Sequence, residues 1–278
     1  MLENLQNINF IDCHSHPHDS RYKKENINID KALEELRAVG GATIAIGTDY
    51  TTSGEAIDLS ERHTNVWASI GIHPVDKHDE IFDTDIFDSF LKSKKVVAIG
   101  ECGLDYYYFE KILLENKDFD IAAEKSRQRN IFIKQIEYAL ENNLPLILHG
   151  RPSKNSMDAY RDILDILESY KNTRGHAHFF VGNIEIAKRF LDLGFLLSFD
   201  GPITFTSEYD EVIKYIPIEM LMIETDSPYA APLRYRGQIN YPIYVLEVAK
   251  KIAYLKNLSV EEVLEITKNN AIKLFTLK

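Results

Sequence analysis

The chain has 278 residues, of which 45% are hydrophobic and 11% aromatic, enough apolar material for the core of one large domain. A formal net charge of -11 argues against a broad basic surface that would bind nucleic acid through many phosphates. Any nucleic-acid substrate must therefore be held locally. The first residues lack the features of a secretory signal, and no apolar run approaches the length of a membrane span. We expect a cytoplasmic protein with no membrane partner, and a monomer.

Short runs rich in Val, Ile, Leu and Phe recur along the chain, separated by longer stretches with helical periodicity. There are eight runs, at residues 9–13, 42–47, 66–72, 96–100, 144–148, 176–180, 195–199 and 220–224. This alternation is the signature of repeated βα units. Eight units at this length favour a single-domain α/β protein over residues 1–278, a closed (β/α)8 TIM barrel rather than an open doubly wound sheet.

The segments between the runs support this interpretation. Asn183 can cap a helix that ends before Gly194, and a capping-box pattern at Ser259 predicts a last helix reaching Phe275, which would close the bottom or side of the barrel. The connection over 106–130 is long and precedes a helix through residues 132–140. It either roofs the pocket or is an excursion without a role in the chemistry.

The two cysteines, Cys13 and Cys102, lie inside or just after apolar runs. We expect reduced thiols that line the barrel and not a disulfide.

Histidines and carboxylates follow the predicted strands. The carboxyl ends of all strands in such a barrel surround one mouth, where side chains two apart point to the same side. His14 and His16 follow the first strand at this spacing, although an HxH pair alone is weak evidence for a metal site. The other strand ends contribute His73, Glu101, His149, His178 and Asp226. This convergence predicts a metal site.

Not every histidine belongs to this set. His176 and His178 share a strand face, and we choose His178 because it is nearer the carboxyl end of the strand. His18, His63 and His78 lie outside the strand ends.

The ligands outnumber the needs of one four-coordinate ion, so we predict two divalent cations. Glu101, from the fourth strand, is the candidate bridge between them. Two such ions lower the pKa of a shared water and favour hydrolysis. Asp226 can bind the first ion and accept the proton of the attacking water; the alternative is that it caps a helix. Zn, Mn, Mg, Co and Ni are all compatible with this ligand set.

Several motifs together resemble the TatD family of metal-dependent hydrolases, within the amidohydrolase-like barrels. They are FIDCHSHP (10–17), SIGIHP (69–74), AIGECGLDYY (98–107), the stretch 128–151 that ends in LILHGR, HAHFFVG (176–182), LSFDGPITF (197–205), IETDSPYAAP (223–232), YRGQIN (235–240) and TKNNAIKLF (267–275). They cover nearly the whole chain in order.

The resemblance implies one ion held by His14, His16, Glu101 and Asp226, and a second held by Glu101, His149 and His178. It also implies a nuclease that cuts phosphodiester bonds of DNA, often from the 3′ end, so the expected partner is a small or single-stranded nucleic acid at the metal site.

Three further residues are candidates for binding the substrate. Arg151 follows a metal histidine by two positions, Arg236 lies in YRGQIN, and His73 ends its strand. Arginine suits a pair of phosphate oxygens, whereas the alternative for Arg236 is a surface salt bridge. Residues 151–157 depart from the family's usual sequence, which predicts a different pocket edge.

Two other functions remain open. The barrel and metals could instead serve an amide, ester or lactone hydrolase, such as the family members described as acting on aminoacylated tRNA. A metal-binding scaffold without catalysis is the third reading. Related barrels commonly bridge their ions with a carboxylated lysine, so Glu101 at this position favours the nuclease.

Overall fold

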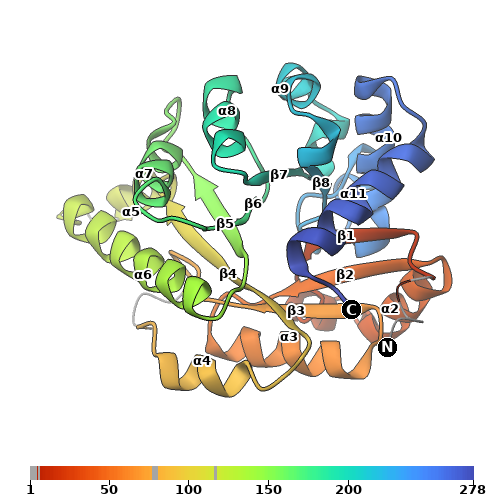
Figure 1. Cartoon of the computed structure of the whole chain (residues 1–278), viewed down its shortest axis with the longest axis horizontal. Coiled ribbons are helices and arrows are strands. Elements are labelled where there is room, and N and C mark those ends of the chain that lie inside the picture. The colour runs from red at the N-terminus through yellow and green to blue at the C-terminus, as the bar shows by residue number, and fades with distance from the viewer. Residues whose placement is uncertain (1–4, 6, 77–80, 116–117) are drawn as a thin grey trace.

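Eight parallel strands form one sheet in chain order in this computed structural model, which describes residues 5, 7–76, 81–115 and 118–278 (Figure 1). The strands are β1 (Phe10–Ser15), β2 (Gly41–Ile46), β3 (Val66–Ile70), β4 (Val96–Asp105), β5 (Leu146–Arg151), β6 (Gly175–Ala177), β7 (Leu196–Phe199) and β8 (Leu221–Ile223). β1 meets β8 through a parallel bridge between Ser15 and Ser227, and the Asp226 N–H donates to the carbonyl of His14 at 2.9 Å. The sheet therefore closes into the predicted (β/α)8 barrel.

The helices surround the strands (Figure 1). The helices are α1 (Ser20–Lys24), α2 (Ile29–Ala38), α3 (Tyr50–Arg62), α4 (Thr84–Phe90), α5 (Tyr108–Glu115), α6 (Ile121–Glu141), α7 (Asp158–Leu167), α8 (Ile184–Asp192), α9 (Asp210–Tyr215), α10 (Val245–Lys256) and α11 (Val260–Phe275). Four short 3-10 helices, η1 (Gly201–Thr204), η2 (Ile218–Met220), η3 (Leu233–Tyr235) and η4 (Pro242–Tyr244), lie between β7 and α10. Within the described ranges, no helix is both long and apolar enough to cross a bilayer.

The predicted helix signals are confirmed. The Asn183 side chain accepts a hydrogen bond from the N–H of Ile186, and Gly194 follows α8 with a φ of +79°. Ser259 and Glu262 form a reciprocal capping box at the start of α11. Both helices begin where a side chain satisfies backbone donors that the first turn leaves unpaired.

The last helix closes the bottom of the barrel, as predicted. Leu274 and Phe275, near the end of α11, belong to one buried cluster with Ile11, Ile44 and other strand residues. The ring of Phe275 also packs edge-on against His176 at a centroid distance of 5.8 Å. A larger cluster fills the layer between the strands and the helices. The end of the barrel at which the strands begin is therefore sealed by apolar side chains.

The connection after β4 differs from its prediction. It is shorter than 106–130, because α6 already begins at Ile121, where the side chain of Asp120 accepts from the N–H of Ala123. Helix α5 precedes it, and Tyr108, its first residue, lines the cavity of the candidate site. This part of the connection therefore borders the pocket, which agrees with the first of the two predicted alternatives, that the connection roofs the pocket.

The cysteine prediction is confirmed. Cys13 and Cys102 are both buried and unpaired. Burial raises the pKa of both thiols, so neither carries the negative charge of a reactive thiolate at neutral pH.

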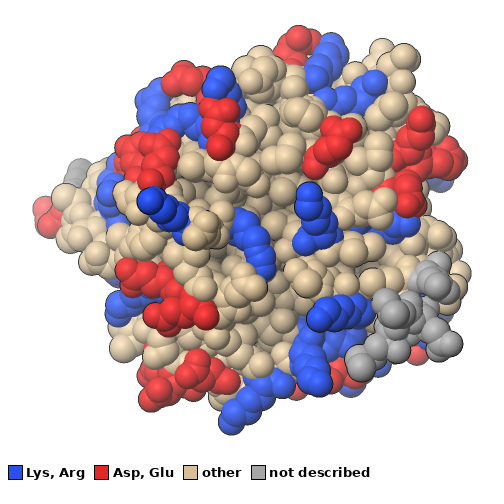
Figure 2. Space-filling view, in the orientation of Figure 1, with Lys and Arg blue, Asp and Glu red and all other residues tan. Residues whose placement is uncertain are grey.

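On the face shown in Figure 2, Lys and Arg side chains are interspersed with Asp and Glu. This face therefore lacks the continuous basic area that a protein uses to bind many phosphates at once.

Candidate metal centre

A cavity of about 800 Å³ lies at the carboxyl ends of the strands. Predicted site residues from six strand ends border it: His16, His73, Glu101, His149, His178 and Asp226. His14 lies next to them and is fully buried. The closed barrel brings these side chains together because every strand runs in the same direction.

The carboxylate of Glu101 lies between two groups of ligand atoms. Its Oε2 is 3.4 Å from His14 Nε2 and 3.9 Å from His16 Nε2. Asp226 completes this first group, with its Oδ1 3.6 Å from His14 Nε2 and 3.3 Å from His16 Nε2. The two imidazole nitrogens are themselves only 3.2 Å apart.

The other oxygen of Glu101 faces the second group. Its Oε1 lies 2.7 Å from His149 Nδ1, 2.8 Å from His178 Nε2 and 3.6 Å from His73 Nε2. The nitrogens of His149 and His178 are 3.5 Å apart. One carboxylate therefore faces both groups, which is the arrangement expected of a bridging ligand.

The distances in the first group fit a bound cation. Ligands bound tetrahedrally at 2.0–2.1 Å lie about 3.4 Å from one another. In the first group, formed by His14, His16, Glu101 and Asp226, the separations between ligand atoms run from 3.2 to 3.9 Å. Triplets drawn from both groups also have all their ligand atoms within 4.8 Å of one another. Imidazole nitrogens and carboxylate oxygens are ordinary ligands of divalent transition metals.

The electrostatics favour positive charge at this position. Burial alone would raise the pKa of Glu101, but His178, His73 and His14 hold it well below its usual range. Burial would likewise lower the pKa of His178, yet the charge of Glu101 raises it well above the ordinary value. The carboxylate thus stays ionised and attracts either protons on the imidazoles or a cation. Because a metal needs neutral imidazole, its binding should release protons.

Two carboxylates that the sequence analysis did not assign lie beside these histidines, and only Asp105 is within hydrogen-bond distance of its neighbour. The Oδ2 of Asp105 lies 3.1 Å from His149 Nε2, on the far side of the ring from Glu101. Glu224 is fully buried, and its Oε1 lies 3.7 Å from His178 Nδ1. Such contacts fix the orientation of histidine ligands. Asp105 lies in the motif segment GLD and Glu224 in IETD, and both segments were noted in the sequence analysis. Their presence in these motifs was the signal that could have identified the two acids.

The structure also shows which of the other histidines contact Glu101. The ring of His176 lies beside Glu224, at 3.8 Å, and is fully buried, whereas His178 contacts Glu101 directly. His73 was proposed to bind substrate, but His73, Glu101 and His149 form one potential metal-binding group. His78 lies outside the described residues.

Of the other predicted residues, Arg151 borders the cavity and Arg236 does not. The guanidinium of Arg236 lies over the ring of Phe205, 4.4 Å from its centroid, and the residue is exposed. Asp226 has a φ of +52°, and the next helical element begins only at Leu233, so the helix-cap alternative is excluded. The side chain of Asp226 instead faces His14 and His16.

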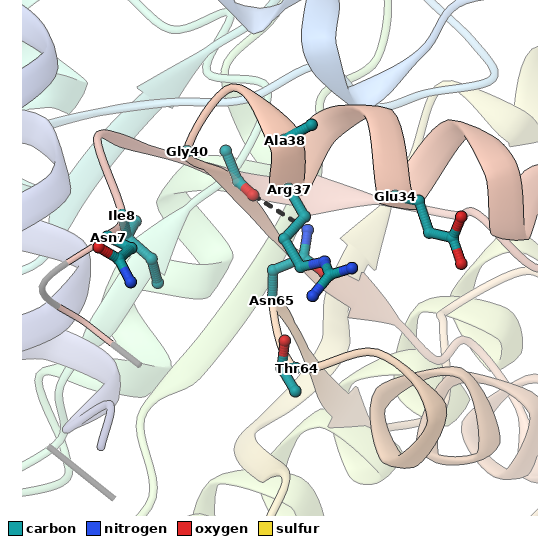
Figure 3. Close-up of a pocket in the computed structure, with 9 residues that line it drawn as sticks. Asn7, Ile8, Glu34, Arg37, Ala38, Gly40, Thr64 and Asn65 are labelled. Atoms are coloured by element: carbon teal, nitrogen blue, oxygen red, sulfur yellow. Dashed lines mark hydrogen bonds between the residues drawn. The ribbon is translucent and has the colours of Figure 1, made fainter. Parts of the chain in front are cut away.

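A second, smaller hollow lies at the other end of the barrel, beside the starts of β2 and β3 (Figure 3). Its volume is about 340 Å³, and its charged residues are Glu34 and Arg37, both exposed. None of the potential metal-binding groups among the described residues includes a residue of this hollow. Among the described residues, the potential metal-binding groups therefore lie on the other side of the barrel from this hollow.

Residues 11–276 match the family described as TatD related DNase. The chain belongs to this family. It is 36% identical over 273 residues to the uncharacterized metal-dependent hydrolase YabD of Bacillus subtilis (strain 168), covering 96% of this chain and 99% of that protein. It is 34% identical over 270 residues to the uncharacterized metal-dependent hydrolase YcfH of Escherichia coli (strain K12), with 95% of each chain covered.

The same similarity extends to a solved structure. The crystal structure of YJJV, a TatD homologue from Escherichia coli K12, superposes with a TM-score of 0.82 at 25% identity, covering 98% of this chain and 100% of that one. Together with the ligand groups around Glu101, these matches make the protein a metal-dependent hydrolase of the TatD family.

Proposed function

We propose that the protein hydrolyses phosphodiester bonds of single-stranded DNA near the 3′ end, with two divalent cations held on either side of Glu101. The observation that carries the proposal is the position of this carboxylate, whose two oxygens face two separate groups of ligands. A pair of cations bound there would lower the pKa of a water and stabilise the charge that develops on the phosphate. The description of the matching family, TatD related DNase, supports the substrate class.

Asp226 is the residue best placed to take the proton. Its side chain is 14% exposed and borders the cavity, whereas the side chain of Glu101 is 5% exposed. A water in the cavity can reach the carboxylate of Asp226, which passes the proton to solvent through the open mouth. Its left-handed backbone turns the side chain back toward His14 and His16.

Arg151 and His73 can hold the substrate or its leaving group. Arg151 is exposed at the end of β5 and borders the cavity, where its guanidinium can bind phosphate oxygens in pairs. The Nδ1 of His73 lies 2.9 Å from Asp76, which orients the ring so that Nε2 faces Glu101. Since this places His73 among the metal-binding groups, we assign the phosphate contact to Arg151 first.

The test uses purified protein loaded separately with Mg, Mn, Zn, Co or Ni. Single-stranded oligonucleotides labelled at either end report cleavage and its direction, while a panel of esters and aminoacylated tRNA tests the alternative amide or ester hydrolase. Elemental analysis gives the number and identity of the bound ions. Two ions per chain and nucleotide release from the 3′ end are expected. Ester turnover without nucleotide release would refute the proposal.

The bridging role is tested by Glu101→Gln. We expect turnover to fall by at least about 100-fold and bound metal to fall below two ions per chain, because the amide has lost the charge that faces both groups. The matched control is Glu185→Gln, an exposed residue at the start of α8. Unchanged activity and metal content in Glu101→Gln would show that this residue bridges nothing.

A further inference from the structure

Two cationic side chains border the cavity on opposite sides. Lys23 lies on α1, directly after β1, and Arg151 ends β5. Since the eight strands are arranged in chain order around a closed barrel, β1 and β5 stand across the mouth from each other. Glu101 and its two groups of ligands lie in the same cavity.

These cations are not neutralised by the acids around them. Neither Lys23 nor Arg151 forms an ion pair with any described residue, and both are exposed. Two of the carboxylates that border the cavity have other partners: Asp19 accepts from the hydroxyl of Tyr229, and Asp76 pairs with His73. In a protein with a net charge of -11, two unpaired cations in one acidic cavity are available for anionic groups of a ligand.

Arg151 also stands beside an aromatic surface. Its guanidinium lies 4.2 Å from the centroid of the Tyr107 ring, and 44% of Tyr107 is exposed. A nucleobase next to a bound phosphate can stack on such a ring or on the guanidinium plane. This side of the cavity therefore has a site for a phosphate and a planar surface for the adjoining base.

We propose that Lys23 and Arg151 bind the two phosphates that flank the scissile one. The inference rests on the proposed function and narrows it: the preferred substrate carries at least three consecutive phosphates. A phosphate on each side of the cut is preferred, so on a longer strand the favoured cut lies one phosphate inside the 3′ end, and the main first product is a dinucleotide. The water oxygen bonds to the phosphorus, one ester P–O bond breaks, and the departing deoxyribose oxygen takes up a proton.

The experiment compares thymidine oligonucleotides with one, two and three phosphates as substrates for the metal-loaded enzyme. We expect kcat/KM to rise about tenfold for each flanking phosphate, the size of one charge-assisted hydrogen bond. Lys23→Ala and Arg151→Ala should each lose about tenfold more kcat/KM on the substrate with three phosphates than on the dinucleotide. Product analysis of a longer strand should show dinucleotides before mononucleotides.

The matched controls are Lys24→Ala, on the same helix as Lys23, and Lys154→Ala, in the loop after Arg151. Both lysines are exposed and neither borders the cavity, so both variants should behave as the wild type. Binding gives a second readout. For a hydrolysis-resistant phosphorothioate strand, the slope of log K against log salt should become shallower by about 0.7 in each cavity variant and remain unchanged in the controls.

The outcomes distinguish the two proposals. If the dinucleotide is cleaved as efficiently as the substrate with three phosphates, the flanking sites do not exist, although phosphodiester hydrolysis stands. If both cavity variants lose the same factor on the dinucleotide, the two cations contact the scissile phosphate and the inference is overturned. Absence of cleavage at every length refutes the proposed function, and this inference with it.

Discussion

Glu224 allows the most quantitative prediction, because it is a fully buried carboxylate behind the histidines of the candidate metal centre. It accepts hydrogen bonds from the N–H of Phe179 at 2.5 Å and from the Ser198 hydroxyl at 2.7 Å. Burial alone would raise its pKa, but the neighbouring imidazoles of His176 and His178 outweigh that effect, so its pKa lies below the usual range. The group is therefore ionised at neutral pH.

Glu224→Gln keeps the size of the side chain and removes its charge. An amide has one oxygen, so one of the two strong donors to Glu224 must face the NH2 group and loses its partner. Leaving a buried donor unpaired costs about 1–3 kcal/mol in the free energy of unfolding. The loss of the carboxylate behind His178 should weaken metal binding by about 10–100-fold, the usual effect of removing a carboxylate that orients a histidine ligand.

Two measurements separate these effects. Urea denaturation of the metal-free protein gives the loss of stability, and competition with a chelator gives metal affinity. Glu219→Gln, at an exposed position on η2 just before β8, is the matched control and should change neither. Ser198→Ala removes one donor and leaves the charge, so its metal affinity should stay closer to the wild type. A folded Glu224→Gln protein with wild-type metal affinity would refute the orienting role.

Three further predictions concern other parts of the structure. Asp105→Asn should weaken metal binding about 10–100-fold by releasing Nε2 of His149, as measured by chelator competition; unchanged affinity would contradict this role. Burial would raise the pKa of Asp158, but hydrogen bonds from Ser153 hold it below the usual value, so its stabilisation is present above about pH 4 and is lost as the pH falls through its folded pKa. Asp158→Asn should therefore lower stability at pH 7 and narrow the difference between pH 7 and pH 3; a wild-type pH profile would exclude this contribution. Ser259→Ala should cost about 1 kcal/mol on urea denaturation by removing the cap of α11, with kcat unchanged, and a loss of kcat would show that α11 acts on the site.

The convergence of histidines and carboxylates at the barrel mouth could be predicted from the sequence because it depends on topology alone. Once eight βα units are recognised, every strand end meets at one mouth, and the spacing of His14 and His16 directs both rings to the same point. The choice of His178 over His176 followed from the same rule, and the structure brings only His178 to Glu101.

What the sequence did not predict depends on local geometry. β4 continues to Asp105 with a register irregularity between Ile99 and Cys102, and only this extension brings Asp105 beside His149. Arg236 lies in an irregular segment between two 3-10 helices, where no sequence periodicity indicates which way its side chain points. Lys23 lies on a five-residue helix, and its position at the cavity depends on how α1 turns after β1.

The closure of the barrel bottom by α11 has a consequence for folding during synthesis. Leu274 and Phe275 belong to α11, which is synthesised after all eight strands, yet they share one buried cluster with residues of the first two. A nascent chain on the ribosome can pair its strands in order, but it cannot bury the barrel interior until α11 has left the exit tunnel. Completion of the fold is therefore tied to its C-terminal helix, and truncation within this helix should leave an open barrel that chaperones and proteases can recognise.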